Sequence, residues 1–253
     1  MLLRRITEHV KAQNWTAVAL DFLIVVVGVF VGLQAQQWTV ERERRASEQR
    51  YLTRLHGDIE KLITLRAHYD NSRPRFAAQL EQAIAILYSG DGEIGPELCT
   101  AIAASAYTTN PPANLPTAVE LLSAGRLDVL RSEALRASLL EFLQEAARTE
   151  VLVNAQSATN KELTGTFPEL IRIRYGTAPE SLGAPDSMWI NPECNAVGMR
   201  ANAAFMNQLG ENAYIYNVYT HRGIAPASRA LQQLHLELDT EIEVAHDTEE
   251  QGA

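Results

Sequence analysis

The sequence contains very little cysteine, since Cys99 and Cys194 are the only two in 253 residues. Two cysteines without a histidine close by in the chain exclude a disulfide-rich fold and a zinc site built mainly on thiolates. They leave two alternatives, which are one disulfide in an oxidising compartment or two unpaired thiols. The separation of the two residues in the chain does not decide between these alternatives.

Basic residues are in deficit as well. The chain has 22 lysines and arginines against 31 aspartates and glutamates, which gives a formal net charge of −9. The acidic excess lies after the first forty residues. Because an acidic domain is repelled by phosphate backbones, we expect no nucleic-acid partner.

Recognisable catalytic and cofactor-binding motifs are also lacking. Gly90–Gly95 matches the pattern G-x-G-x-x-G, but it follows a helical pattern rather than a strand. Its two carboxylates, Asp91 and Glu93, would repel a pyrophosphate. We interpret the segment as a turn, and the sequence predicts no catalytic residue and no cofactor.

Metal-ligand spacing occurs at one place, near the end of the chain. His235, Asp239, Glu243 and His246 lie near one face of the last predicted helix, and metal ligands can be spaced in this way. The opposite face carries the apolar residues. A solvent-exposed surface is therefore the favoured interpretation, and no metal site is predicted.

What the sequence does contain is one long uncharged run, Phe22–Val40. Trp15 and Trp38 bracket it, and on a helix they would lie roughly 34 Å apart, which is close to the thickness of a bilayer. We predict a transmembrane helix over residues 16–38, with both tryptophans as interfacial anchors and the lipid bilayer as a partner. A signal peptide cleaved near Ala35 and a buried helix of a soluble protein are less favoured alternatives.

Small and polar residues stand out within this helix. Gly28, Gly32 and Ala35 lie on one stripe and include the pattern G-x-x-x-G, which predicts a homodimer formed through the transmembrane helix. The alternative is that glycine is simply common in membrane helices. Asp21 is interpreted as an intramembrane polar residue that reaches the nearby headgroups, rather than as a contact to a partner inside the bilayer.

The flanking charges give a nearly balanced prediction of the membrane side. Basic residues occur before the helix and after it, at Arg4, Arg5, Lys11, Arg42, Arg44, Arg45, Arg50 and Arg54. Their number slightly favours a cytoplasmic C-terminal side, but a short basic N-tail before a single anchor is typical of a cytoplasmic N-terminus. We predict a cytoplasmic N-terminus and a periplasmic C-terminal domain in a cell inner membrane.

The rest of the chain follows a helical pattern. We predict a basic N-tail over 1–15, the transmembrane helix over 16–38, a juxtamembrane amphipathic helix over 39–70, a soluble α-helical domain over 71–247 and a disordered tail over 248–253. Period-two alternation is nearly absent. The predicted fold is all-α, with a single N-terminal transmembrane helix continuing into an irregular helical bundle.

Several local signals mark the ends of the predicted helices. Pro74 suits the first turn of a second helix that starts after Tyr69. Thr117 and Glu120 have the spacing of a capping box, and Ser132 suits an N-cap. The segment 176–195, rich in glycine and proline, predicts a long loop.

The anchor resembles that of a family of uncharacterised bacterial single-pass membrane proteins, a domain of unknown function. Asp21 stands where the family has glutamate, Val25–Gly28 matches its aliphatic block, and Gly32–Gln34 and Gln36–Trp38 follow in register. A second similarity lies in Glu120–Arg136. The resemblance implies a bacterial inner membrane and an α-helical domain, and it supplies no activity.

These observations favour a protein-interaction or sensory-type module tethered to a membrane, with an unidentified protein partner. One alternative is an enzyme or small-ligand-binding domain with a pocket between helices near 176–195. Another is a scaffold subunit of a membrane complex. The sequence alone does not separate the three hypotheses.

Overall fold

The structure is a computed structural model that describes residues 15–177 and 188–242. The predicted tails over 1–15 and 248–253 lie outside these residues, apart from the backbone of Trp15, and so do the side chains of Trp15 and Asp21. The described elements are helices, apart from one two-stranded sheet. This confirms the predicted all-α fold class.

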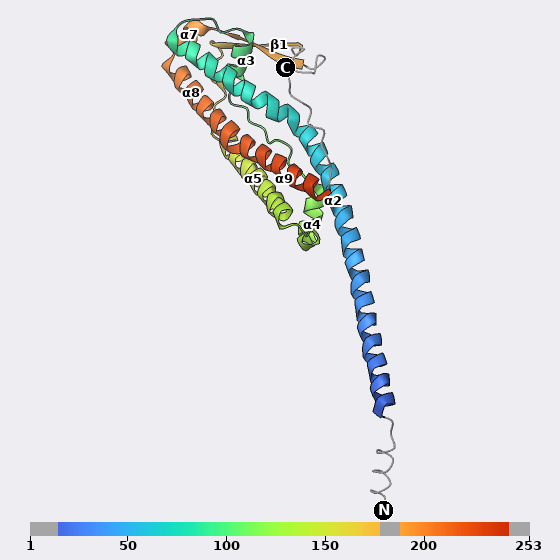
Figure 1. The fold of residues 1–253 in the computed structure, drawn as a ribbon. Helices are drawn as coiled ribbons and strands as arrows, with labels where there is room; N and C mark the ends of the chain where they lie inside the picture. The colour runs from blue at the N-terminus through green and yellow to red at the C-terminus, as the bar shows by residue number, and fades with distance from the viewer. Residues whose placement is uncertain (1–14, 178–187, 243–253) are drawn as a thin grey trace, which may run out of the picture. The chain divides into compact units, whose positions relative to one another are not determined.

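Helix α2 (Trp15–Ser89) is the first described element, and Figure 1 shows the others following it. The chain divides into two compact units, residues 1–51 and 52–253. The remaining elements are α3 (Pro96–Ala103), α4 (Pro116–Ser123), the 3-10 turn η1 (Leu127–Val129), α5 (Glu133–Ser157), α6 (Leu163–Thr166), β1 (Ile171–Thr177), β2 (Met188–Cys194), α7 (Ala196–Ala201), α8 (Ala203–Val218), the π-helix η3 (Tyr219–Ile224) and α9 (Ala225–Ile242).

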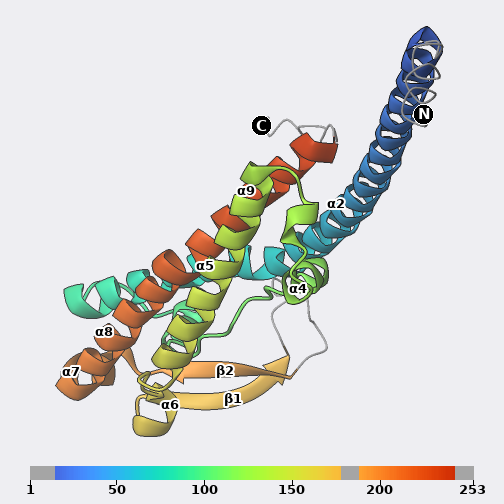
Figure 2. The ribbon, with the colours of Figure 1, turned by 90° about the horizontal axis from the view of Figure 1, so that it is seen from below.

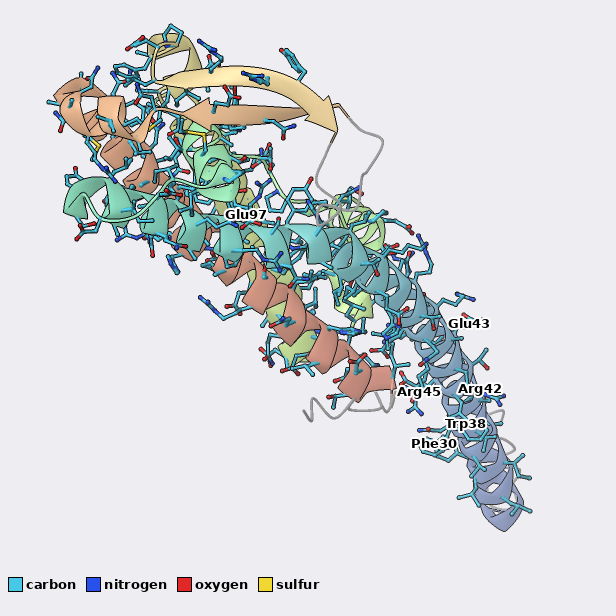
Figure 3. The ribbon with its side chains drawn as sticks, turned by 90° about the horizontal axis from the view of Figure 1, so that it is seen from above. Phe30, Trp38, Arg42, Glu43, Arg45 and Glu97 are labelled. Atoms are coloured by element: carbon cyan, nitrogen blue, oxygen red, sulfur yellow. A yellow bond between two sulfur atoms is a disulfide. The ribbon has the colours of Figure 1, made fainter. Side chains whose placement is uncertain are left out.

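In the first unit, no other described part of the chain covers the apolar part of α2. Every residue from Phe22 to Val40 is exposed. Figure 3 shows Phe30 and Trp38 projecting from the helix, with the charged Arg42 following along the chain. This part of α2 is long and apolar enough to cross a membrane.

In the second unit, α2 presents an apolar stripe to the core, in which Leu55, Ile59 and Leu80 are fully buried. The prediction that a helix ends near Tyr69 and another begins at Pro74 was wrong, because Pro74 lies inside α2. A proline removes one backbone donor from a helix interior. Here the buried side chains before and after the proline outweigh that loss.

Two predicted helix starts have different outcomes. Ser132 caps α5 as predicted, since its hydroxyl accepts a hydrogen bond from the Leu135 amide. The capping box at Thr117 was wrong, because α4 already begins at Pro116. The Thr117 amide instead donates to Asp58 Oδ2 of α2, at 2.9 Å. A carboxylate from another helix thus takes the place of the local cap at this positive helix end.

The predicted long loop over 176–195 was also wrong in its described part. Strands β1 and β2 pair antiparallel, and Figure 2 shows them side by side. Ile171 and Ile173 turn towards the core while the arginines between and after them are exposed, so a short alternation was present. Pro192 in β2 is tolerated because a strand of a two-stranded sheet has a free edge.

The main core contains buried side chains of α2, α3, α8 and η3, together with Ile171 at the start of β1. Phe167 meets Phe205 edge to face, and Tyr216 meets Tyr219 in the same way. Both arrangements are favourable for aromatic rings. Burial raises the pKa of Tyr216 to about 12.

A fully buried amide, Asn212 of α8, joins three parts of the second unit. Its Nδ2 donates to Ser105 Oγ at 3.1 Å and to the Lys161 carbonyl at 2.8 Å, and its Oδ1 accepts from the Lys161 amide at 3.1 Å. The side chain therefore pairs with both backbone groups of Lys161 in the segment after α5 and with the buried Ser105 hydroxyl.

Replacing Asn212 with alanine should lower the free energy of unfolding by about 2–4 kcal/mol, because both backbone groups of Lys161 lose their partner. Urea denaturation of the purified protein measures the loss. Asn207 is an exposed asparagine on the same helix, and Asn207→Ala should change stability by no more than about 0.5 kcal/mol. Equal effects of the two substitutions would contradict the role given to Asn212.

Candidate functional site

Two histidines and an aspartate from distant parts of the chain meet between α2 and α9. His56 lies on α2, and His235 and Asp239 lie one turn apart on α9. His56 Nε2 is 3.2 Å from Asp239 Oδ1, and His235 Nε2 is 3.6 Å from the same oxygen. The centroids of the two imidazole rings are 5.4 Å apart. One carboxylate oxygen thus faces both imidazoles.

The surroundings of this cluster are largely dry. The side chain of Asp239 is only 8% exposed, and those of His56 and His235 are 16% and 20% exposed. The other nitrogen of His56, Nδ1, is 3.6 Å from Glu60 Oε2 on the next turn of α2. The cluster therefore has a second carboxylate behind one of its imidazoles.

The structure corrects the prediction that His235 and Asp239 lie on a solvent-exposed face. That face of α9 is covered by α2, so Asp239 is buried. Glu243 and His246, the other members of the predicted set, lie outside the described residues. His56 had no ligand spacing in the sequence, and its place beside the apolar stripe of α2 was the only signal that it would be partly buried.

The cluster can act in two chemical ways. Imidazole nitrogens and a carboxylate oxygen are the donors that zinc and similar divalent metals take in proteins. The same groups can also form an ion pair when an imidazole is protonated. Both ways join α2 to α9.

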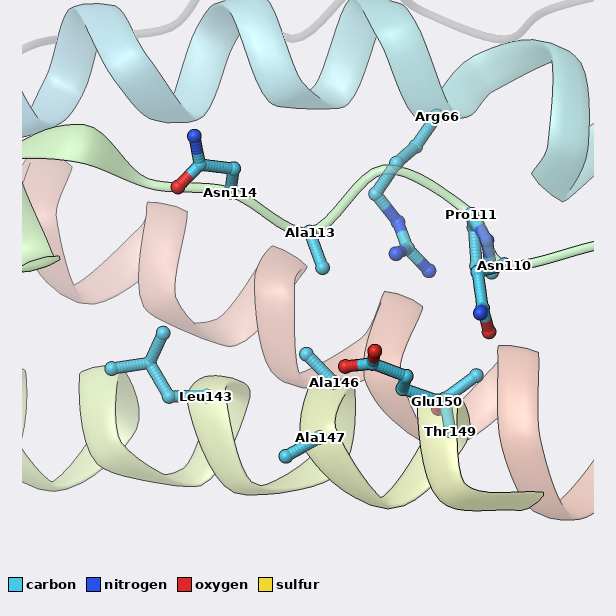
Figure 4. A pocket seen from close by; sticks show the side chains of 10 residues that line it. All are labelled: Arg66, Asn110, Pro111, Ala113, Asn114, Leu143, Ala146, Ala147, Thr149 and Glu150. Atoms are coloured by element: carbon cyan, nitrogen blue, oxygen red, sulfur yellow. The ribbon is translucent and has the colours of Figure 1, made fainter. Parts of the chain in front are cut away.

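A cavity of about 350 Å³ lies between α2, the segment 110–114 and α5. Figure 4 shows the Arg66 guanidinium and the Glu150 carboxylate pointing into it, and Asn110 and Leu143 also line it. This cavity does not lie near residues 176–195, where a ligand pocket was predicted. In its described part, that segment forms the hairpin instead.

Arg66 is the most deeply buried charged side chain among the described residues. It donates to the Pro112 carbonyl at 2.9 Å and to Ser228 Oγ at 3.0 Å, and Asp70 Oδ1 lies 3.7 Å away. Burial lowers the pKa of Arg66, and the negative charge of Asp70 opposes this shift. The guanidinium connects α2, the segment 110–114 and α9.

Comparisons with known proteins found no match. No protein-family model matches the chain, and neither curated proteins nor solved structures match it significantly. The resemblance of the anchor to bacterial single-pass membrane proteins therefore stays a prediction.

Residues predicted to act in the membrane lie on the exposed part of α2. Trp38 and Ala35 are exposed, and a Cβ atom added at Gly28 or at Gly32 would meet nothing within 4 Å. Both glycines therefore present open backbone.

The two cysteines are brought together in the second unit. Cys99 of α3 and Cys194 at the end of β2 form a disulfide, with their Cα atoms 5.7 Å apart. Cys99 is buried. Of the two alternatives left by the sequence, the structure has the disulfide.

Arg66→Leu should lower the free energy of unfolding by about 2–4 kcal/mol, because the Pro112 carbonyl and the Asp70 carboxylate lose a charged donor in a buried place. Arg75→Leu on the same helix is the matched control, since Arg75 is exposed, and it should cost no more than about 0.5 kcal/mol. Urea denaturation monitored by circular dichroism measures both. An equally mild effect of the two would remove Arg66 from its connecting role.

Proposed function

We propose that the chain is a membrane-anchored protein whose helical domain serves as a protein-interaction or sensory-type module. The observation that carries this proposal is the apolar part of α2, where every residue from Phe22 to Val40 is exposed. Its part without polar side chains, Phe22–Leu33, forms a contiguous apolar surface that is stable in hydrocarbon and unfavourable in water. The lack of a catalytic motif favours a binding role over an enzymatic one.

The disulfide between Cys99 and Cys194 supports a side of the membrane for the domain. Such bonds persist in oxidising compartments such as the bacterial periplasm. The proposed arrangement has a cytoplasmic N-terminus and a periplasmic C-terminal domain. The resemblance of the anchor to bacterial single-pass proteins supports the inner membrane as its place.

Alkaline phosphatase fused after Ala253 should be active in a bacterial host, and a green fluorescent protein fusion at the same point should be dark. After denaturation, the protein of native sequence should react with a maleimide reagent only once its disulfide has been reduced. The Cys99→Ser variant should react without reduction, because its Cys194 thiol has no partner. The labelled and unlabelled forms are separated by gel electrophoresis. A fluorescent fusion together with free thiols in the native protein would contradict the periplasmic placement.

The glycine stripe supports a second copy of the chain as one partner. Because Gly28 and Gly32 have open space where a side chain would begin, another helix can approach their backbone closely. The helical domain would bind an unidentified protein partner in addition to this second copy. In the alternative, the chain would be a scaffold subunit of a larger membrane complex.

Gly28→Ile and Gly32→Ile should each abolish a cross-linked dimer in membranes, because the added side chain separates the two helices. Val26→Phe adds bulk two residues away, on the opposite side of the helix, and should leave the cross-linked fraction unchanged. Gel electrophoresis after chemical cross-linking measures that fraction. If the isoleucine variants cross-link as well as the native chain, this interface is not the one used.

Binding of a small polar ligand is a second candidate function, and the Arg66 cavity favours it. Its volume of about 350 Å³ falls in the range of ligand pockets. A buried guanidinium and a carboxylate that point into one cavity can fix the orientation of a ligand carrying both a negative group and a donor.

A further inference from the structure

We propose that His56, His235 and Asp239 bind one divalent transition-metal ion of the zinc type, and that this ion joins the C-terminal half of α9 to α2. This inference goes beyond the proposed function and does not depend on the membrane side. It rests on the position, burial and chemistry of the three side chains.

The distances between the donor atoms agree with a shared ion. Two donors bound to a tetrahedral zinc ion at about 2.1 Å lie roughly 3.4 Å from each other. The two nitrogen–oxygen separations are 3.2 Å and 3.6 Å, and the three ligand atoms all lie within 4.8 Å of one another. Both separations exceed the roughly 2.7–2.9 Å of a charge-assisted hydrogen bond.

The burial of the cluster favours a cation over water. A buried carboxylate is costly unless it is paired or coordinates a metal. Asp239 is only 8% exposed and faces two imidazoles rather than one. An ion pair with Asp239 needs only one protonated imidazole, whereas a bound metal ion would take both imidazoles as ligands.

Glu60 supplies the outer carboxylate that histidine ligands of metals usually have. Its Oε2 lies 3.6 Å from Nδ1 of His56, on the side of the ring that faces away from Asp239. A hydrogen bond from Nδ1 to this carboxylate would place the ring proton on Nδ1, so that the lone pair of Nε2 would be the one that binds the metal. His56 would thus be set for coordination through the nitrogen that already points to the cluster.

The donor set selects the class of ion. Two imidazoles and one carboxylate suit zinc, nickel, copper(II) or iron(II), and they do not suit calcium or magnesium, which prefer oxygen ligands. Both cysteines of the chain are in the disulfide, so no thiolate is present to favour copper(I). Three protein ligands leave a fourth position open for water or another ligand.

The test is a zinc titration of the full-length, untagged protein after removal of metal with EDTA. Competition with a chromophoric zinc chelator should give one site per chain. His56→Ala, His235→Ala and Asp239→Asn should each abolish that site, and Glu60→Gln should weaken it about tenfold. His68→Ala is the matched control, because His68 is an exposed histidine on the same helix, and it should bind like the native chain.

A second readout separates metal binding from misfolding. Cobalt(II) added to the native protein should produce the visible absorption of a four-coordinate ion, and the three ligand variants should lack it while keeping the native circular dichroism spectrum. Absence of a site in the native chain would overturn the proposal. Binding that survives all three ligand substitutions, or that is lost equally in His68→Ala, would also overturn it.

Discussion

The burial of one apolar stripe, on α2 after Leu52, is the constraint that the second unit is built to meet. Leu55, Ile59 and Leu80 are fully buried, and their removal from water is the main favourable term available to a domain of this size. The stripe also contains Arg66, whose charge can be buried only with partners. Its hydrogen bonds to the Pro112 carbonyl and to Ser228 place a loop and α9 against the same helix.

The helices were predictable because their signals are local. The 3.6-residue period marks the soluble part of α2, Ser132 marks the start of α5, and the leucines of α9 mark its buried face. The all-α class followed from these patterns. The apolar part of α2 could also be predicted, because an uncharged run is identified from the sequence alone, without knowledge of tertiary contacts.

The features that sequence reasoning missed all depend on contacts between distant residues. The amide of Thr117 is capped by Asp58 rather than by its own side chain. Helix α2 continues through Pro74 because packing on both sides of the proline supports it. The hairpin shows only one short alternation, next to glycine and proline. His56 becomes a possible ligand only because α9 returns to α2, and no spacing along one helix could have indicated this.

With only two cysteines, formation of the disulfide has an unusual constraint. The partners are 95 residues apart, so Cys99 waits as a free thiol until Cys194 has been synthesised. No third thiol exists with which either could pair wrongly inside one chain. The remaining error is a bond between two chains, and the proposed anchoring in a bilayer would favour that error by raising the local concentration of the chains. Early packing of β2 against α3 would therefore favour the bond within one chain over a covalently linked pair of chains.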